Sequence, residues 1–197
     1  MTSKSKKLPL ILASGSRYRA ELLKRLGLPF TQQSSDVDEA EQPGEAPAAL
    51  ALRLAVEKAQ VIAARNPDCW VLGSDQVAAL AQNRFGKPGT RARAIQQLKL
   101  LSGRSAQFIT AVALLRDGEP AHTAVDTTVV RFRKLSAAEI ERYVDAEPAF
   151  DCAGSFKCEG LGITLCESIE TRDPTALIGL PLIATRALLS ETGFQLP

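Results

Sequence analysis

The amino-acid sequence predicts a mixed α/β fold in which helices cover a β-sheet. Short apolar runs typical of buried strands alternate with segments whose apolar residues recur at helical spacing. No internal repeat, low-complexity tract or linker divides the chain. Its 197 residues, 45% of them hydrophobic, are enough for one domain with a sizeable core. We therefore expect a polar tail over residues 1–7 and a single domain over residues 8–197.

The first third of the chain predicts a strand, a turn and a helix in succession. Residues 8–13 form an apolar run of the buried-strand type, and a Ser/Gly turn follows it. Leucines recur at helical spacing over 17–26, and Gly27 closes that segment as a helix C-terminal glycine does. A second strand is predicted over 30–34, and an acidic loop over 34–41.

The middle of the chain predicts two helices around a buried strand. Apolar residues repeat at three- and four-residue intervals over 46–65, which predicts the longest helix, and Pro67 terminates it. Residues 70–72 are typical of a buried strand, which we expect to end where the polar residues of 73–77 begin. Another helix is predicted over 92–101.

The remainder of the chain predicts a hairpin followed by a capped helix. Two β-rich runs, 107–115 and 123–132, flank the Asp117-Gly118 dipeptide, which is a strong hairpin signal. Ser136 and Glu139 have the spacing of a capping box, so a helix should begin there. A Gly-rich loop, a short strand and a final helix are predicted at 152–162, 163–167 and 181–191.

Charge and composition exclude several classes of function. The 24 basic and 22 acidic residues are spread along the chain, so the net charge of +2 gives no argument for nucleic-acid binding. No apolar span is long enough to cross a bilayer, and the N-terminal apolar stretch is too short for a signal sequence. The four cysteines lack a CxxC pair. We expect a cytoplasmic protein with reduced thiols and no membrane partner.

Two segments offer groups for chemistry on an anion. The Ser/Gly turn at 13–19 lies between a strand and a helix, where free N–H groups and the helix dipole attract phosphate, with Arg17 or Arg19 beside it. A plain structural turn is an equally good interpretation. Asp75 follows a buried strand, so it is the best candidate for a catalytic carboxylate, although an aspartate that serves only a turn is the alternative.

Acids and lysines elsewhere complete the set of candidates. Carboxylates of the loop 36–39 are able to complete a magnesium or manganese site with Asp75, although such a run is usually a solvated loop. Lys58 and Lys87 are lone lysines, which are usually surface residues, and no Walker A pattern is present. His122 is the only histidine, which excludes a histidine-dependent triad and favours a carboxylate with a hard divalent cation.

In this order, the segments resemble the Maf family of nucleotide pyrophosphatases. The matching pieces are 12–16 with Arg19, 37–39, 57–59, 73–76, 86–88 and 179–181. The resemblance implies an elongated mixed β-sheet flanked by helices, with two lobes around a central cleft, as in Maf and ITPase proteins, and often a homodimer. It also implies roles for individual residues: Asp75 as proton acceptor and metal ligand, Glu39 as metal ligand, and Ser14, Arg19, Lys58 and Lys87 as phosphate contacts.

Within that family, 73–77 and 153–162 look like the branch that acts on 7-methyl-GTP. Methylation at N7 leaves a positive charge on the purine, which favours an aromatic face such as that of Tyr18. Glu159 is able to accept hydrogen bonds from the guanine edge. Gln76 follows the catalytic aspartate, where the branch that acts on dTTP and UTP typically has threonine. Tyr18, Gln76 and Glu159 are therefore the predicted base-specificity residues.

The function expected from this resemblance is hydrolysis of 7-methyl-GTP to 7-methyl-GMP and pyrophosphate, with Mg²⁺ or Mn²⁺ as the cofactor, which removes a modified nucleotide. One alternative keeps the pyrophosphatase chemistry and changes the substrate to other unmodified or modified nucleotides. Another is a nucleotide-binding regulator of cell division without turnover. The expected partner is a small-molecule nucleotide, with a possible homodimer.

Overall fold

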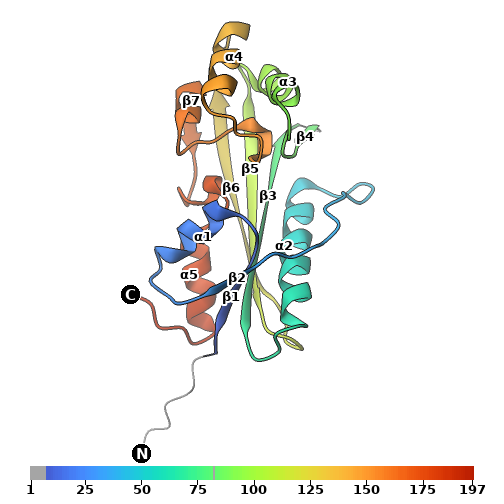
Figure 1. The fold of residues 1–197 in the computed structure, drawn as a ribbon, viewed down its shortest axis with the longest axis vertical. Coiled ribbons are helices and arrows are strands. Elements are labelled where there is room, and N and C mark those ends of the chain that lie inside the picture. Colours follow the sequence, from blue (N-terminus) through green and yellow to red (C-terminus); the bar gives the residue numbers. More distant parts are fainter. Residues whose placement is uncertain (1–7, 82) are drawn as a thin grey trace, which may run out of the picture.

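One seven-stranded mixed sheet organises the chain (Figure 1). The computed structural model describes residues 8–81 and 83–197, so the tail expected at 1–7 lies outside the described residues. The strand order is β2-β1-β3-β5-β6-β7, and β4 pairs with β3. The strands are β1 Leu10–Ala13, β2 Thr31–Gln33, β3 Trp70–Leu80, β4 Asn83–Phe85, β5 Ser105–Leu115, β6 His122–Phe132 and β7 Cys166–Glu170.

Three long antiparallel strands form the central part of the sheet. Each of β3, β5 and β6 has 11 residues, and β5 pairs with both of the others. β1 joins β3 in parallel, and β2 joins β1 in parallel. The expected mixed sheet is confirmed, and its long strands run between the two ends of the elongated molecule (Figure 1).

Helices divide the molecule into two lobes. One lobe holds α1, α2 and α5, and the other holds α3 and α4 together with β4 and β7 (Figure 1). The helices are α1 Arg17–Lys24, α2 Pro47–Ala63, α3 Arg91–Leu101, α4 Ala137–Ala146 and α5 Leu182–Glu191. Three 3₁₀ turns, η1 Ala153–Ser155, η2 Leu161–Leu165 and η3 Ala176–Ile178, lie in the last third of the chain.

Strand alternation places α2 on one face of the sheet and α1 with α5 on the other. Leu72 of β3 belongs to the apolar cluster that contains residues of α1 and α5. Its neighbour Val71 belongs to a cluster with Ala59 and Ile62 of α2. Successive side chains of a strand point to opposite faces, so one run of apolar residues in β3 serves both packed layers.

Helices α1 and α4 each begin with a side-chain cap, and the cap at Ser136 was predicted from the sequence. The Ser136 hydroxyl accepts from the backbone N–H of Glu139, and the Glu139 carboxylate accepts from the backbone N–H of Ser136 at 2.8 Å, which completes the capping box. At the start of α1, the Ser16 hydroxyl accepts from the backbone N–H of Arg19. The Ser/Gly turn is therefore also a helix N-cap.

The sequence interpretation was wrong about where β3 ends. The strand was expected to stop before the polar residues, but it continues through Asp75 to Leu80. It continues because distant groups satisfy its polar side chains: the buried Ser74 hydroxyl contacts the carbonyl oxygens of Ala111 and Gly179 at 2.8 and 3.0 Å. Such partners leave no signal in the local sequence.

Two smaller expectations also differ from the structure. The short strand β4 was not predicted, because three residues are too few to show a period. The strand expected over 163–167 begins later, at Cys166, because η2 takes up the residues before it. Among the described residues, no helix has the length and apolarity needed to cross a membrane. The four cysteines in the described part of the chain are free thiols.

Gly73 allows α2 to approach β3 unusually closely. A Cβ added at Gly73 would lie 2.2 Å from the backbone oxygen of Ala55, which is well inside contact distance. Lys58 lies one helical turn after Ala55, and Asp75 lies two residues after Gly73 on the same face of β3. The glycine therefore sets the separation between the helix and strand that carry these two charged side chains.

We predict that Gly73→Ala lowers the free energy of unfolding by about 1–3 kcal/mol, because the added methyl group must push α2 away from β3. Urea denaturation followed by circular dichroism measures this loss. Gly86→Ala is the matched control, since a Cβ at Gly86 meets nothing within 4 Å. Equal stability of the Gly73 variant and wild type would show that the close approach does not constrain the helix.

Candidate active site

A cleft of ≈ 340 Å³ lies where the two lobes meet. Its walls come from the β1–α1 turn, the acidic loop, α2 and β3 on one side, and from the segments 86–87 and 151–159 on the other. All the site residues predicted from the sequence line this cleft: Ser14, Tyr18, Arg19, Glu39, Lys58, Asp75, Gln76, Lys87 and Glu159. The structure thus brings together residues that are far apart in the chain.

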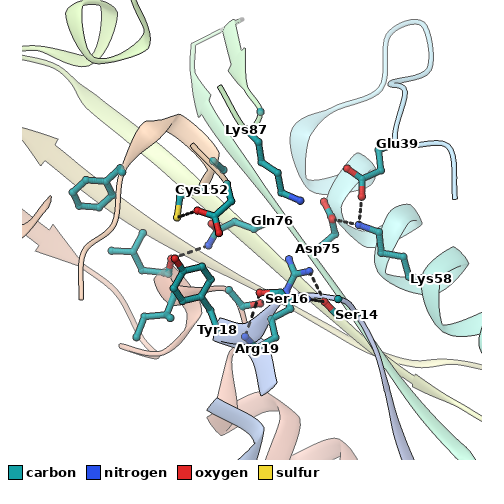
Figure 2. Close-up of a pocket in the computed structure, with 18 of the residues that line it drawn as sticks. Ser14, Ser16, Tyr18, Arg19, Glu39, Lys58, Asp75, Gln76, Lys87 and Cys152 are labelled. Atoms are coloured by element: carbon teal, nitrogen blue, oxygen red, sulfur yellow. Dashed lines mark hydrogen bonds and ion pairs between the residues drawn. The ribbon is translucent and has the colours of Figure 1, made fainter. Parts of the chain in front are cut away.

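Lys58 binds two carboxylates at the end of the cleft beside α2 (Figure 2). Its ammonium donates to Glu39 Oε1 at 2.5 Å and to Asp75 Oδ1 at 2.6 Å. Lys58 and Asp75 are only 6% and 8% exposed, so each charge depends on the other for compensation. Partial burial is the largest single effect and raises the pKa of the Glu39 carboxyl, but the hydrogen bond and charge of Lys58 and the charges of Lys87 and Arg19 together outweigh it, so the net pKa lies below the usual range.

Arg53 holds the acidic loop that carries Glu39. Its guanidinium donates to Glu45 Oε1 at 2.8 Å and to the carbonyl oxygen of Ala40 at 2.9 Å, and so ties the segment that follows Glu39 to α2. The hydrogen bond from Arg53 lowers the pKa of the Glu45 carboxyl to about 2. The loop was expected to be either solvated or part of the site, and here it is fixed over the cleft.

Arg19 lies at the base of the Ser/Gly turn, where its guanidinium is held in place. Nε donates to the carbonyl oxygen of Gly179 at 2.9 Å, and Nη1 donates to Ser14 Oγ at 3.3 Å. Burial lowers the pKa of Arg19, and the carboxylates of Asp75 and Glu39 partly offset that effect. These two bonds use two of the five guanidinium N–H donors, so others remain for an anion in the cleft.

Lys87 supplies positive charge from the opposite lobe. It lies in the loop between β4 and α3, and its side chain points into the cleft toward Asp75 (Figure 2). The charge of Lys87 contributes to the lowered pKa of Glu39. Arg19, Lys58 and Lys87 thus surround the Asp75 carboxylate from three separate segments of the chain.

The other end of the cleft is lined by the Tyr18 ring, the Gln76 amide and the acids Asp151 and Glu159, and the Gln76 amide is held in one orientation. The Gln76 amide nitrogen lies 3.0 Å from the hydroxyl of Thr110 and from the carbonyl oxygens of Ala176 and Leu177. This environment fixes the amide with its nitrogen directed into the protein, so the carbonyl oxygen is the Gln76 group available to a bound base. Asp75 and Gln76 therefore serve opposite ends of the cleft from adjacent positions on β3.

Cations already occupy the surroundings of the Tyr18 ring. The Arg17 guanidinium lies 4.8 Å from the ring centroid and donates to the Tyr18 hydroxyl at 2.8 Å. The Lys157 ammonium lies 5.8 Å from the same centroid. Lys157 was not singled out from the sequence, although it lies in the predicted Gly-rich loop. Asp151 and Phe156 line the cleft and were missed, because Asp151 lies outside the matched segments and Phe156, within 153–162, was given no role.

The carboxylates of Asp75 and Glu39 both contact the Lys58 ammonium, so they lie close to each other. Within residues 8–81 and 83–197, no group of three or more His, Cys, Asp or Glu side chains gathers as a metal centre. Mg²⁺ usually takes one or two carboxylates and completes its shell with substrate phosphates and water. The donor set of hard oxygen atoms therefore fits a divalent cation that arrives with a triphosphate.

Comparison with known proteins identifies the family. Residues 9–192 match the family described as Maf-like protein, and the chain belongs to this family. A relative from Xanthomonas oryzae, named 7-methyl-GTP pyrophosphatase, is 60% identical over 188 residues, which cover 95% of this chain and 98% of that protein. A Bordetella parapertussis protein of the same name is 55% identical over 186 residues, 94% of this chain and 93% of that protein.

A solved structure of a HAM1 protein from Coxiella burnetii aligns with this chain at a TM-score of 0.46 and 22% identity. The alignment covers 66% of this chain and 75% of that one.

We predict that Lys58→Met lowers the free energy of unfolding by about 3 kcal/mol, because it leaves the buried Asp75 carboxylate without its partner. The double variant Lys58→Met/Asp75→Asn should recover part of this loss. Urea denaturation of the single and double variants measures the coupling. The exposed pair Lys24–Glu21 offers the control Lys24→Met, with an expected change below about 1 kcal/mol. Strictly additive losses at positions 58 and 75 would contradict the prediction.

Proposed function

We propose that this protein hydrolyses 7-methyl-GTP to 7-methyl-GMP and pyrophosphate. The observation that carries the proposal is the position of Asp75, which is buried on β3 among three cationic side chains and next to an amide that faces the base end of the cleft. The names of the relatives at 55–60% identity support the substrate. The free cysteines of the described chain are compatible with a reducing compartment, and we place the reaction in the cytoplasm.

The cleft supplies the groups that hydrolysis of a phosphoanhydride requires. We assign Arg19, Lys58 and Lys87 to the triphosphate, where their charges stabilise the negative charge that develops on the departing pyrophosphate. The Ser14 hydroxyl and the first N–H groups of α1 extend this anion site. In the structure, Lys58 contacts both acids, so phosphate binding has to compete with Asp75 and Glu39 for its ammonium.

We assign the activation of water to Asp75, whose carboxylate accepts the proton of the attacking water molecule. Asp75 and Glu39 would also hold a divalent cation, Mg²⁺ or Mn²⁺. When bound, this cation withdraws charge from the phosphates. The two acids come from different elements, β3 and the loop held by Arg53, so the correct separation depends on how α2 packs between them.

The base end suits a purine with a positive charge. Tyr18 offers an aromatic face, Gln76 offers a fixed carbonyl oxygen, and Glu159 offers a carboxylate at the exposed rim of the cleft. Methylation of N7 makes the ring cationic, so the two acceptors and the π-face each interact with it more strongly than with neutral guanine. This difference is the physical basis we propose for selection of 7-methyl-GTP over GTP.

Asp75→Asn should reduce turnover of 7-methyl-GTP at least about 100-fold, because the amide cannot accept the proton of the attacking water. Release of pyrophosphate with added Mg²⁺ or Mn²⁺ measures the effect, and excess chelator should abolish wild-type activity. Asp145→Asn on the exposed side of α4 is the matched control. Wild-type rates in the Asp75 variant would remove this residue from the mechanism, and full activity in chelator would remove the metal.

Glu159→Gln should lower the ratio of kcat/KM for 7-methyl-GTP to that for GTP by about fivefold, because the amide loses the charge that favours the methylated base. A panel of 7-methyl-GTP, GTP, UTP and dTTP with detection of pyrophosphate measures the ratio. Equal rates on every nucleotide in the wild type would favour a general pyrophosphatase. An unchanged ratio in the variant would mean that Glu159 has no part in base selection.

A further inference from the structure

Glu147 makes an unusual number of contacts for an acid outside the cleft. It follows the last residue of α4, and its side chain is only 15% exposed. Its carboxylate accepts from the Lys157 ammonium at 2.8 Å and from the backbone N–H of Leu161. Burial raises the pKa of Glu147, but the hydrogen bonds from Lys157 and nearby backbone N–H groups and the charge of Lys157 together outweigh it, so the pKa lies below its usual range. The mechanism proposed above uses none of these contacts.

These contacts tie the Gly-rich turn 157–162 to the end of α4. The Lys157 carbonyl oxygen accepts from the N–H groups of Gly160 and Gly162 at 3.2 and 3.1 Å, which closes the turn. The Lys157 N–H contacts the hydroxyl of Tyr143, also on α4, at 3.2 Å. A Cβ at Gly160 would lie 2.2 Å from Glu147 Oε1, so the turn wraps directly around the carboxylate.

The turn held in this way carries charges that a bound base would meet. Glu159 lines the cleft from this turn. The Lys157 ammonium lies 5.8 Å from the centroid of the Tyr18 ring, on the aromatic group assigned to the base. An uncompensated ammonium there would repel a cationic purine, whereas the ion pair with Glu147 neutralises it.

We infer that Glu147 is a positioning residue for base selection: its carboxylate fixes the turn that presents Glu159 to the cleft and neutralises Lys157 beside the Tyr18 ring. The inference rests on the proposed function, because it assumes that a cationic purine binds at this end of the cleft. In this proposal Glu147 does not itself contact the substrate. It acts through Glu159, which lines the cleft, and through Lys157, which lies beside the Tyr18 ring.

The test measures binding rather than turnover, by isothermal titration with the α,β-methylene analogues of 7-methyl-GTP and GTP in the presence of Mg²⁺. These analogues resist cleavage between the α and β phosphorus atoms. Glu147→Gln should lower the preference for the methylated analogue by about fivefold, mainly through weaker binding of that analogue. Glu141→Gln, on the exposed side of α4, is the matched control and should keep the wild-type preference.

A second substitution separates a charge effect from a loss of structure. In Glu147→Gln/Lys157→Met the repelling ammonium is gone, so the preference for the methylated analogue should recover, whereas a merely structural defect would grow worse. Lys157→Met alone should raise the preference above wild type, since Glu147 then adds an unpaired negative charge. This variant tests the inference even if Glu147→Gln proves too unstable to purify.

The outcomes distinguish the inference from the proposed function. If wild type prefers the methylated analogue and Glu147→Gln keeps that preference, the inference is overturned and the proposed function stands. An unchanged or lower preference in Lys157→Met also overturns it. If wild type binds both analogues equally or neither of them, the proposed substrate is wrong, and the role of Glu147 in its selection is overturned with it.

Discussion

The contact between the Lys58 ammonium and the carboxylates of Glu39 and Asp75 links three parts of the molecule. It joins α2, β3 and the acidic loop within the cleft, and two of the three side chains are nearly inaccessible to solvent. Such an arrangement is costly unless every charge is compensated, so the packing of α2 on the sheet and the hold of Arg53 on the loop both serve it. The contact also places a lysine where a triphosphate and a cation are proposed to bind.

Much of the fold could be predicted from the sequence wherever the signal is local. The capping box at Ser136 involves residues three apart, and the period of α2 repeats over 17 residues. The expected end of β3 was wrong because its polar residues are satisfied by groups such as the carbonyl oxygen of Gly179, 105 positions away from Ser74. Partners at that separation have no trace in composition or periodicity.

Only the site residues to which a family motif gives a role could be predicted from the sequence. Taken alone, Lys58 and Lys87 have the character of surface lysines, and only the ordered family pattern marked them as part of a site. The structure places both in the cleft, and Lys58 is buried there. Glu147 lay outside any recognised motif, and Lys157 lay within the matched segment 153–162 but was given no role. The contact between the two residues depends on a turn that folds back against α4, which only the three-dimensional structure shows.

The long strands have a consequence for how the two lobes are joined. β3 and β5 stay paired without interruption from Val71 opposite Leu115 to Ala79 opposite Gln107, so one rigid ladder passes through both lobes. A hinge between domains requires a few residues free to change their backbone angles, and this ladder offers none along that length. The positions of Asp75 and Gln76 relative to each other are thus set by the sheet, and accommodation of the proposed nucleotide falls to the surrounding loops.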